Sequence, residues 1–200
     1  MVNFKWNTNL YDMTEMIILP FVVDEINQQH KQAMIDKFIY DRIEGNLDRP
    51  GYNISYDDPE YKSIICNKFI NLIKDNFDNL DHQINEVMPW IYVQNNIHYK
   101  SEWHNHDRTS TINAVFYIDP PKDGGELCIS YPPAPGNVVM VKPEVNMIYV
   151  FPYWLYHKPM PQKDSHWRIS VNLEYHCSPR PIIKGETEED LQKADERFII

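Results

Sequence analysis

The chain has 200 residues, of which 42% are hydrophobic and 13% aromatic, a composition that supports a folded core and excludes a disordered chain. Its 29 acidic and 19 basic residues give a formal net charge of -10, which argues against bulk binding of nucleic acid through its phosphates. No apolar run approaches the roughly 20 residues needed to span a bilayer, so no membrane segment is expected.

The length fits a single domain, residues 1–200, in three parts. Residues 1–87 are expected to be mainly helical, residues 88–178 to form the core, and residues 179–200 to be a C-terminal extension. Residues 1–6 contain no signal-peptide core, which predicts a cytoplasmic protein. Three cysteines lack metal-type spacing and are expected to be reduced, mostly buried thiols: Cys66, Cys128 and Cys177.

Two amphipathic helices are predicted in the first third of the chain. Asp24 is placed to cap the first helix and Gly45 to end it. Its apolar face comprises Ile35, Phe38, Ile39 and Ile43. Asp58 and Pro59 provide a cap and a first-turn proline for the second helix. The apolar face of that helix comprises Tyr61, Ile65, Phe69, Leu72 and Ile73, and both faces are expected to pack against a sheet.

Beyond Met88 the sequence changes to short segments rich in β-branched and aromatic residues, separated by proline, glycine, asparagine and aspartate. Strands are predicted at residues 90–95, 112–118, 126–130, 138–141, 147–151 and 167–175. Turns are predicted at residues 119–125 and 132–136, because proline and glycine interrupt regular structure there. Helices followed by many short strands predict an α+β fold, a double-stranded β-helix (jelly roll) with the N-terminal helices packed on one sheet. The acidic residues 185–200 have a weak helical pattern.

Histidines gather at residues 102–107, which have the sequence EWHNHD. His104 and His106 are two residues apart at the expected end of a strand, so their side chains leave the same face and can reach one ion. A third histidine, His157, follows an aromatic run at residues 149–156, and this run would give a metal-bound imidazole a dry and rigid setting. Chance clustering is the competing explanation, because the chain has eight histidines.

Arg168 comes eleven residues after His157, on a predicted strand where alternation places it on one face with Ser170. An inward-facing arginine is costly unless it meets an anion, and a guanidinium binds a carboxylate through two parallel hydrogen bonds. The anion could be an internal carboxylate, Glu126 or Glu174, or a bound diacid. The histidines upstream favour the diacid, and together these residues suggest a non-haem iron site beside a dicarboxylate cosubstrate.

This set of residues resembles the 2-oxoglutarate and Fe(II)-dependent oxygenases, and among them the prolyl-hydroxylase-like group and the phage and bacterial group. The resemblance covers about residues 90–175 and rests on features that occur in the same order. After the first histidine cluster these are Phe116-Tyr117-Ile118, the Gly124-Gly125 turn, Phe151-Pro152, and the distal histidine with its arginine. Each feature alone is weak, whereas the ordered set is specific.

The resemblance implies an enzyme, a hydroxylase that uses Fe(II), O2 and 2-oxoglutarate and releases succinate and CO2. It makes His104 and His157 iron ligands. It also assigns the distal carboxylate of 2-oxoglutarate to Arg168, with help from Tyr117 and Ser170.

The third iron ligand departs from the commonest family pattern, which has aspartate two positions after the first histidine. Here His106 occupies that position and Asp107 follows it, so either residue is a candidate. The His-x-His form resembles the phage-like branch and favours His106. A neutral imidazole in place of a carboxylate would leave the site one unit more positive.

Two other functions are compatible with these residues. One is a cupin-like metalloenzyme that does not use 2-oxoglutarate, and the other is a non-enzymatic jelly-roll binding module with incidental histidines. The acidic balance mildly favours a protein, peptide or small-molecule substrate over nucleic acid. No pattern in the sequence indicates an oligomeric state.

Overall fold

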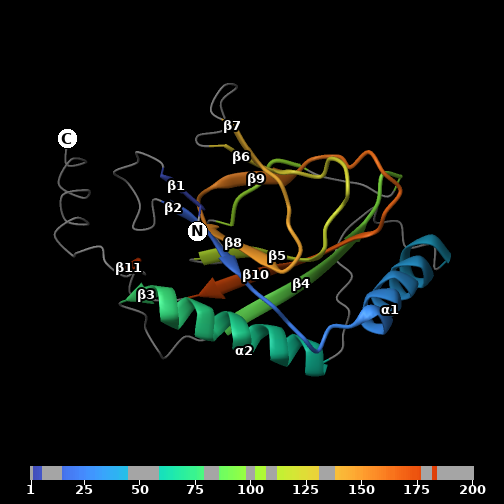
Figure 1. Cartoon of the computed structure of the whole chain (residues 1–200), viewed down its shortest axis with the longest axis horizontal. Helices are drawn as coiled ribbons and strands as arrows, with labels where there is room; N and C mark the ends of the chain where they lie inside the picture. The colour runs from blue at the N-terminus through green and yellow to red at the C-terminus, as the bar shows by residue number, and fades with distance from the viewer. Residues whose placement is uncertain are drawn as a thin grey trace.

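The computed structural model describes residues 2–5, 15–44, 59–78, 86–97, 102–106, 112–130, 138–176 and 182–183. Some sequence predictions fall outside these ranges: those for Gly45, Asp58, Asp107, the turn at 132–136, Cys177 and residues 185–200. The described part contains helices and antiparallel sheets, as an α+β fold requires (Figure 1).

Helix α1 (Gln28–Phe38) is capped by Asn27 and not by Asp24, which corrects the sequence prediction. The Asn27 side chain accepts hydrogen bonds from the backbone N–H groups of Gln29 (2.8 Å) and His30 (3.2 Å). The His30 ring accepts one from the Asn27 N–H in return, at 3.1 Å. This reciprocal cap satisfies donors that the first helical turn leaves open, so the helix begins there, and Asp24 lies in the preceding turn.

The chain continues from α1 into a short π-helix, η1 (Ile39–Glu44), and helix α2 (Pro59–Asn76) begins at the predicted proline. Ile65, Phe69 and Ile73 are fully buried in α2, while Tyr61 and Leu72 are half-buried. No helix in the described part of the chain is long and apolar enough to cross a membrane.

Two sheets form the body of the structure. The six-stranded sheet has the order β1 (Val2–Lys5), β2 (Glu15–Pro20), β8 (Met147–Pro152), β5 (Ile112–Asp119), β10 (Arg168–His176) and β4 (Glu86–Gln94). The three-stranded sheet has the order β7 (Val138–Val141), β6 (Leu127–Ser130) and β9 (Tyr156–Pro159). A small pair joins β3 (Phe77–Asp78) to β11 (Ile182–Ile183). In Figure 1 the three-stranded sheet lies on one side of the six-stranded sheet and α2 lies on the other.

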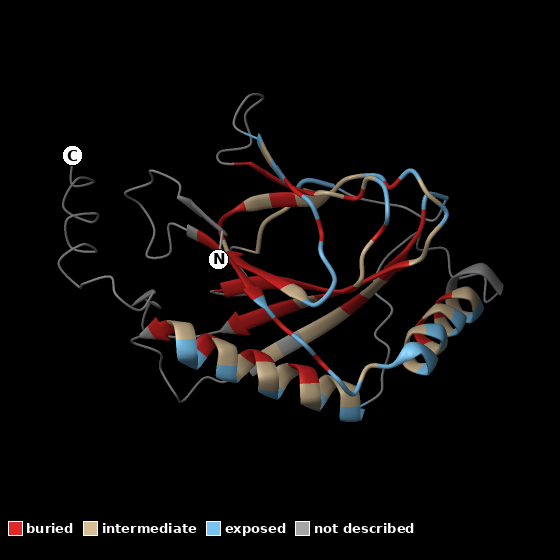
Figure 2. Ribbon diagram, in the orientation of Figure 1, coloured by how far each residue is buried: buried red, intermediate tan, exposed pale blue. Residues whose placement is uncertain are grey.

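Each face of the six-stranded sheet packs against its own apolar cluster. The helical side buries Phe38, Phe69 and Ile73 with sheet residues such as Phe116 and Tyr175, and the Phe69 and Tyr175 rings meet edge to face at 6.4 Å. The side facing the small sheet buries a second cluster, which includes Val115, Tyr117, Leu127, Ile129, Tyr149 and Phe151. Figure 2 agrees with this division, because the central strands are mostly buried and the outer side of α2 is exposed. The helices therefore pack on one sheet, as predicted.

All six predicted strands are present, with ends shifted by four residues or fewer. Strands β1, β2, β3, β9 and β11 were not predicted. The apolar run from Met16 to Leu19 is buried throughout, so it lacks the alternation that distinguishes a strand from a helix. Strand β9 has the polar sequence YHKP, which shows no period at all. Of these missed strands β2 and β9 matter most, because β2 extends the large sheet and β9 carries His157.

Candidate metal centre

The histidine segment at residues 102–106 lies beside β9 through backbone pairing. The His104 N–H donates to the His157 oxygen at 3.2 Å, and the His157 N–H donates to the His104 oxygen at 2.9 Å. Strand β9 itself pairs with β6, and His157 of β9 lies opposite Ile129 of β6. Direct pairing brings two imidazoles from distant parts of the sequence together, with ring centroids 4.4 Å apart.

His106 completes a group of three rings. Its backbone N–H donates to the backbone carbonyl oxygen of Tyr153 at 2.9 Å, which fixes the backbone two residues beyond His104. The His106 ring lies 5.1 Å from the His157 ring and 5.2 Å from the His104 ring, measured between centroids. One ligand nitrogen from each ring falls within 4.8 Å of the others, so a single ion can be shared by all three.

The Nδ1 atom of each of the three rings has a hydrogen-bond partner. Nδ1 of His104 lies 2.9 Å from the backbone carbonyl oxygen of Glu102, and Nδ1 of His157 lies 3.0 Å from the backbone carbonyl oxygen of Leu155. Because a carbonyl can only accept, these two Nδ1 atoms carry the proton and leave the Nε2 lone pair for a ligand. This tautomer is the one that binds a metal through Nε2.

The third ring is held in a different way, by the Glu174 carboxylate at 2.8 Å from Nδ1 of His106. Nε2 of His106 is buried and has no hydrogen-bond partner among the described residues. A buried lone pair without a partner is unfavourable unless a proton or a metal meets it. The donor set therefore fits a metal ion, and imidazoles suit iron, zinc, copper and nickel.

Burial keeps the rings in the form that binds metal. Desolvation lowers the pKa of His157 well below its usual value, and the neighbouring His104 and His106 lower it further. Desolvation also lowers the pKa of His104. Metal ligation requires the neutral imidazole, so these shifts leave both rings ready to bind at neutral pH.

The aromatic run before His157 supplies the expected dry wall. Phe151, at 1% exposure, lies edge to face with the His157 ring at 4.8 Å, and Trp154 and Leu155 are also buried. Such packing restricts the ring orientation and keeps water away from the inner nitrogen.

Arg168 begins β10 and is 2% exposed. The alternation predicted for this strand is present, since Ile169, Val171 and Leu173 belong to the helical-side cluster. Glu174, six residues further along the same strand, lies about 20 Å from Arg168 at 3.3 Å per residue. That separation excludes Glu174 as the ion-pair partner of Arg168, one of the two internal carboxylates considered from sequence.

Tyr117 and Ser170 lie beside Arg168 on the inner face. They are directly opposite one another in the pairing of β5 with β10, next to a register shift between Ile169 and Ser170. Both are buried. Burial raises the pKa of the Tyr117 phenol, and the nearby Arg168 guanidinium partly opposes that rise. The phenol therefore stays protonated, so a guanidinium and two hydroxyl groups gather at this end of the strand.

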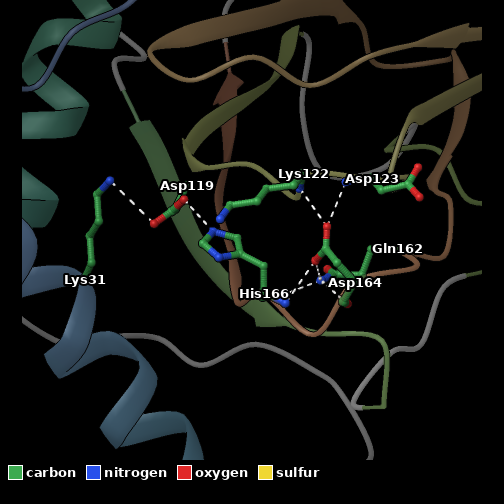
Figure 3. Close-up of polar contacts among 7 residues, drawn as sticks. All are labelled: Lys31, Asp119, Lys122, Asp123, Gln162, Asp164 and His166. Carbon is green, nitrogen blue, oxygen red and sulfur yellow. Dashed lines mark hydrogen bonds and ion pairs between the residues drawn. The ribbon is translucent and has the colours of Figure 1, made fainter.

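A network of loop contacts holds the chain just before Arg168 (Figure 3). The Asp164 carboxylate accepts hydrogen bonds from the backbone N–H groups of Lys122 (2.9 Å), Asp123 (2.7 Å) and His166 (2.9 Å). The His166 ring contacts Asp119 at 2.8 Å, and Asp119 also pairs with Lys31 of α1 at 3.6 Å. The network ties the predicted turn at 119–125 to the entry of β10, and so supports the position of Arg168.

Glycine is required in that turn. Gly124 and Gly125 have φ angles of 76° and 70°, a backbone region that residues with a Cβ atom rarely adopt. A Cβ on Gly124 would lie 2.8 Å from the Pro161 carbonyl oxygen, and the Gly125 N–H donates to that oxygen at 3.1 Å. The turn is therefore packed closely against the loop that leads to Arg168.

Sequence reasoning missed the contact between His106 and Glu174. Alternation along the strand places Glu174 on the same face as Arg168 and Ser170, which was the signal available. The role of Asp164 had no such signal, since two of its partners are the backbone N–H groups of Lys122 and Asp123, 42 and 41 residues away in sequence.

Solved structures with low sequence identity have a similar fold. AviO1 from Streptomyces viridochromogenes is 14% identical, with 86% of this chain and 93% of that chain covered and a TM-score of 0.54. SnoK, a non-heme alpha ketoglutarate dependent carbocyclase from nogalamycin biosynthesis, is 15% identical, with 84% and 83% covered and a TM-score of 0.53. A prolyl hydroxylase from Trichoplax adhaerens, in complex with a hypoxia inducible factor peptide, is 14% identical, with 80% and 83% covered and a TM-score of 0.50.

This likeness shows the fold. No protein-family model matches the sequence. No curated protein matches it either. The chemistry of the site therefore has to be argued from the residues themselves.

Proposed function

We propose that the protein is an Fe(II)- and 2-oxoglutarate-dependent oxygenase built on a double-stranded β-helix, with a C–H bond of its substrate as the site of hydroxylation. The observation that carries the proposal is the set of three imidazoles whose Nδ1 atoms are all hydrogen-bonded, leaving three Nε2 atoms for one ion. The buried Arg168 on the inner face supports it, because a cation there suits an anionic cosubstrate.

In this proposal His104, His106 and His157 hold the iron. Bound iron would supply the oxidising chemistry: one oxygen atom of O2 enters the substrate C–H bond, and the other enters succinate as 2-oxoglutarate loses CO2. We assign the third ligand to His106, because its Nε2 is buried beside the other two rings. The short His-x-His motif is also our reason for grouping the chain with the phage and bacterial oxygenases.

Arg168 would bind the distal carboxylate of 2-oxoglutarate. Its guanidinium offers two parallel N–H donors, and the hydroxyl groups of Ser170 and Tyr117 can add a donor each. The raised pKa of Tyr117 keeps its proton available for this purpose. The apolar wall formed by Phe151 and Leu155 would exclude water from the metal side of the site.

We expect the substrate to be a protein, a peptide or a small molecule. The net charge of -10 disfavours nucleic acid. A prolyl hydroxylase in complex with a peptide and a carbocyclase from nogalamycin biosynthesis both have this fold, which supports a peptide or a small molecule.

The test is production of succinate from 2-oxoglutarate by the full chain with added Fe(II), in the presence of O2. His157→Ala should abolish both this turnover and Co(II) binding, because it removes the most deeply buried ligand. Lys163→Ala, which removes an exposed charge, serves as the control. Turnover that persists in His157→Ala would contradict the proposed centre.

A second candidate is a cupin-like metalloenzyme that does not consume 2-oxoglutarate. The observation that favours it is the all-imidazole ligand group, which contains no carboxylate within the described residues. Tight Co(II) binding by the wild type without any 2-oxoglutarate-dependent succinate would select this candidate. Absence of metal binding would instead point to a binding module.

A further inference from the structure

Glu174 is a buried carboxylate that the proposed function has not used. Its side chain is 8% exposed, and Oε1 lies 2.8 Å from Nδ1 of His106, whose side chain is 10% exposed. The two residues are 68 positions apart in the sequence, and Glu174 reaches the histidine from the inner face of β10.

We propose that Glu174 is a positioning residue for His106 and the source of the negative charge that three neutral imidazoles lack. This inference rests on the proposed metal centre. The carboxylate accepts the Nδ1–H of His106, which orients the ring so that Nε2 faces the other two histidines. The same hydrogen bond makes Nε2 a stronger donor to a cation.

The three rings differ in how they are held. His104 and His157 each bond the backbone carbonyl two residues earlier, an arrangement that the local chain provides by itself. His106 depends on a side chain from the six-stranded sheet. Its orientation is therefore the part of the centre that a single substitution outside the ligands can change.

Charge gives a second reason for a carboxylate at this position. Two histidines and one carboxylate form the common ligand set for non-haem Fe(II) oxygenases, in which the carboxylate offsets one of the two metal charges. A set of three imidazoles leaves both charges in place. Glu174 would restore the balance from the opposite side of the His106 ring, through its hydrogen bond to Nδ1.

The surroundings of Glu174 suit this role. Asn113 lies directly opposite it on β5, and Phe151 lies opposite Asn113 on β8. Asn113 and Phe151 are buried to about the same extent as Glu174. A carboxylate buried among such neighbours loses much of its hydration, so a cation shared by the histidines would stabilise it strongly.

The experiment measures Co(II) affinity of the full chain for the wild type, Glu174→Gln and the control Glu144→Gln. Glutamine keeps the size of the side chain and an oxygen acceptor, but removes the charge. We expect Glu174→Gln to bind Co(II) roughly 10- to 100-fold more weakly, the usual effect of losing a ligand-supporting carboxylate. Glu144→Gln should bind within about two-fold of the wild type, because the Glu144 side chain is exposed and its backbone N–H donates to the Tyr149 hydroxyl and not to a histidine.

Equal Co(II) affinity in Glu174→Gln and the wild type would overturn the inference and leave the metal centre intact. An equal loss in both variants would also overturn it, since the effect would then be general electrostatics. A wild type that binds no Co(II) would instead overturn the proposed function, and the inference with it.

A second measurement needs no variant of Glu174. In the Zn(II)-loaded wild type with 15N-labelled histidine, NMR identifies the protonated nitrogen of each bound ring. We expect all three rings to carry the proton on Nδ1, with the His106 proton furthest downfield because its acceptor is a carboxylate. Coordination of His106 through Nδ1, or an unshifted proton there, would refute the role of Glu174.

Discussion

Replacing Arg168 with alanine tests the cosubstrate site most directly. Arg168 is 2% exposed at the start of β10, and its guanidinium lies near the Tyr117 phenol. Truncating one member of a buried charge pair costs roughly 2–5 kcal/mol. At 1.36 kcal/mol for each factor of ten, this corresponds to an increase of about 30- to 5,000-fold in the 2-oxoglutarate concentration needed.

Metal binding should change little in the same variant. Arg168 is separated from Glu174, the residue that contacts His106, by about 20 Å along β10. Two assays on one preparation therefore separate the effects: succinate formation against 2-oxoglutarate concentration, and Co(II) titration. Arg168→Lys should fall between the wild type and alanine, because an ammonium keeps the charge but loses the two parallel hydrogen bonds.

Lys163→Ala is the matched control, since it removes a cation five residues away that is 74% exposed. Its 2-oxoglutarate requirement should stay that of the wild type. An unchanged requirement in Arg168→Ala would refute the assignment of Arg168 as the anchor. A parallel loss of Co(II) affinity would show instead that the variant disturbs the whole site.

Two further predictions concern the fold. Phe69→Ala should lower the free energy of unfolding, measured by urea denaturation, by about 3–5 kcal/mol, because it leaves a cavity under Tyr175. The control Asn67→Ala, on the exposed side of α2, should change the free energy of unfolding by no more than about 0.5 kcal/mol. A similarly small loss for Phe69→Ala would show that α2 does not pack on the sheet. For Asp164, slight burial acts to raise the pKa, but hydrogen bonds from the Asp123, His166 and Lys122 backbone outweigh it and lower the pKa below the usual 3.8. The charged form is therefore stabilised in the folded protein, and this stabilisation is present above the unfolded-state pKa and lost as pH falls through the folded-state pKa. The difference in unfolding free energy between the wild type and Asp164→Asn should stay constant from neutral pH to about pH 5 and shrink below about pH 4. A difference that persists at about pH 2 would show that the charge of Asp164 does not cause it.

Local periodicity was sufficient to predict much of the fold. The apolar stripe at Ile65, Phe69 and Ile73 predicted which side of α2 is buried, because a helix repeats every 3.6 residues. Alternation on β10 likewise predicted that Arg168 and Ser170 face inward. The position of the α1 cap was wrong, because the reciprocal bonds of Asn27 and His30 depend on the geometry of both side chains.

The site was less accessible from sequence than the elements that carry it. Spacing predicted that His104 and His106 share a face, but the pairing of His104 with His157 is a backbone contact across 53 positions. The partner of His106 was missed because Glu174 was considered only as a partner for Arg168. Contacts of this kind depend on which strands become neighbours, and no local pattern specifies that.

The strand order of the six-stranded sheet has a consequence for how the protein is made. Within the described chain, β1 and β2 are the only neighbours in that sheet that follow one another in sequence, and β10 alone joins β4 to the other strands. While the ribosome is still adding residues before position 168, β4 has no hydrogen-bonding partner in the sheet. The nascent chain must therefore keep its apolar strands from aggregating until β10, residues 168–176, has been translated. Refolding from denaturant should be slow for the same reason.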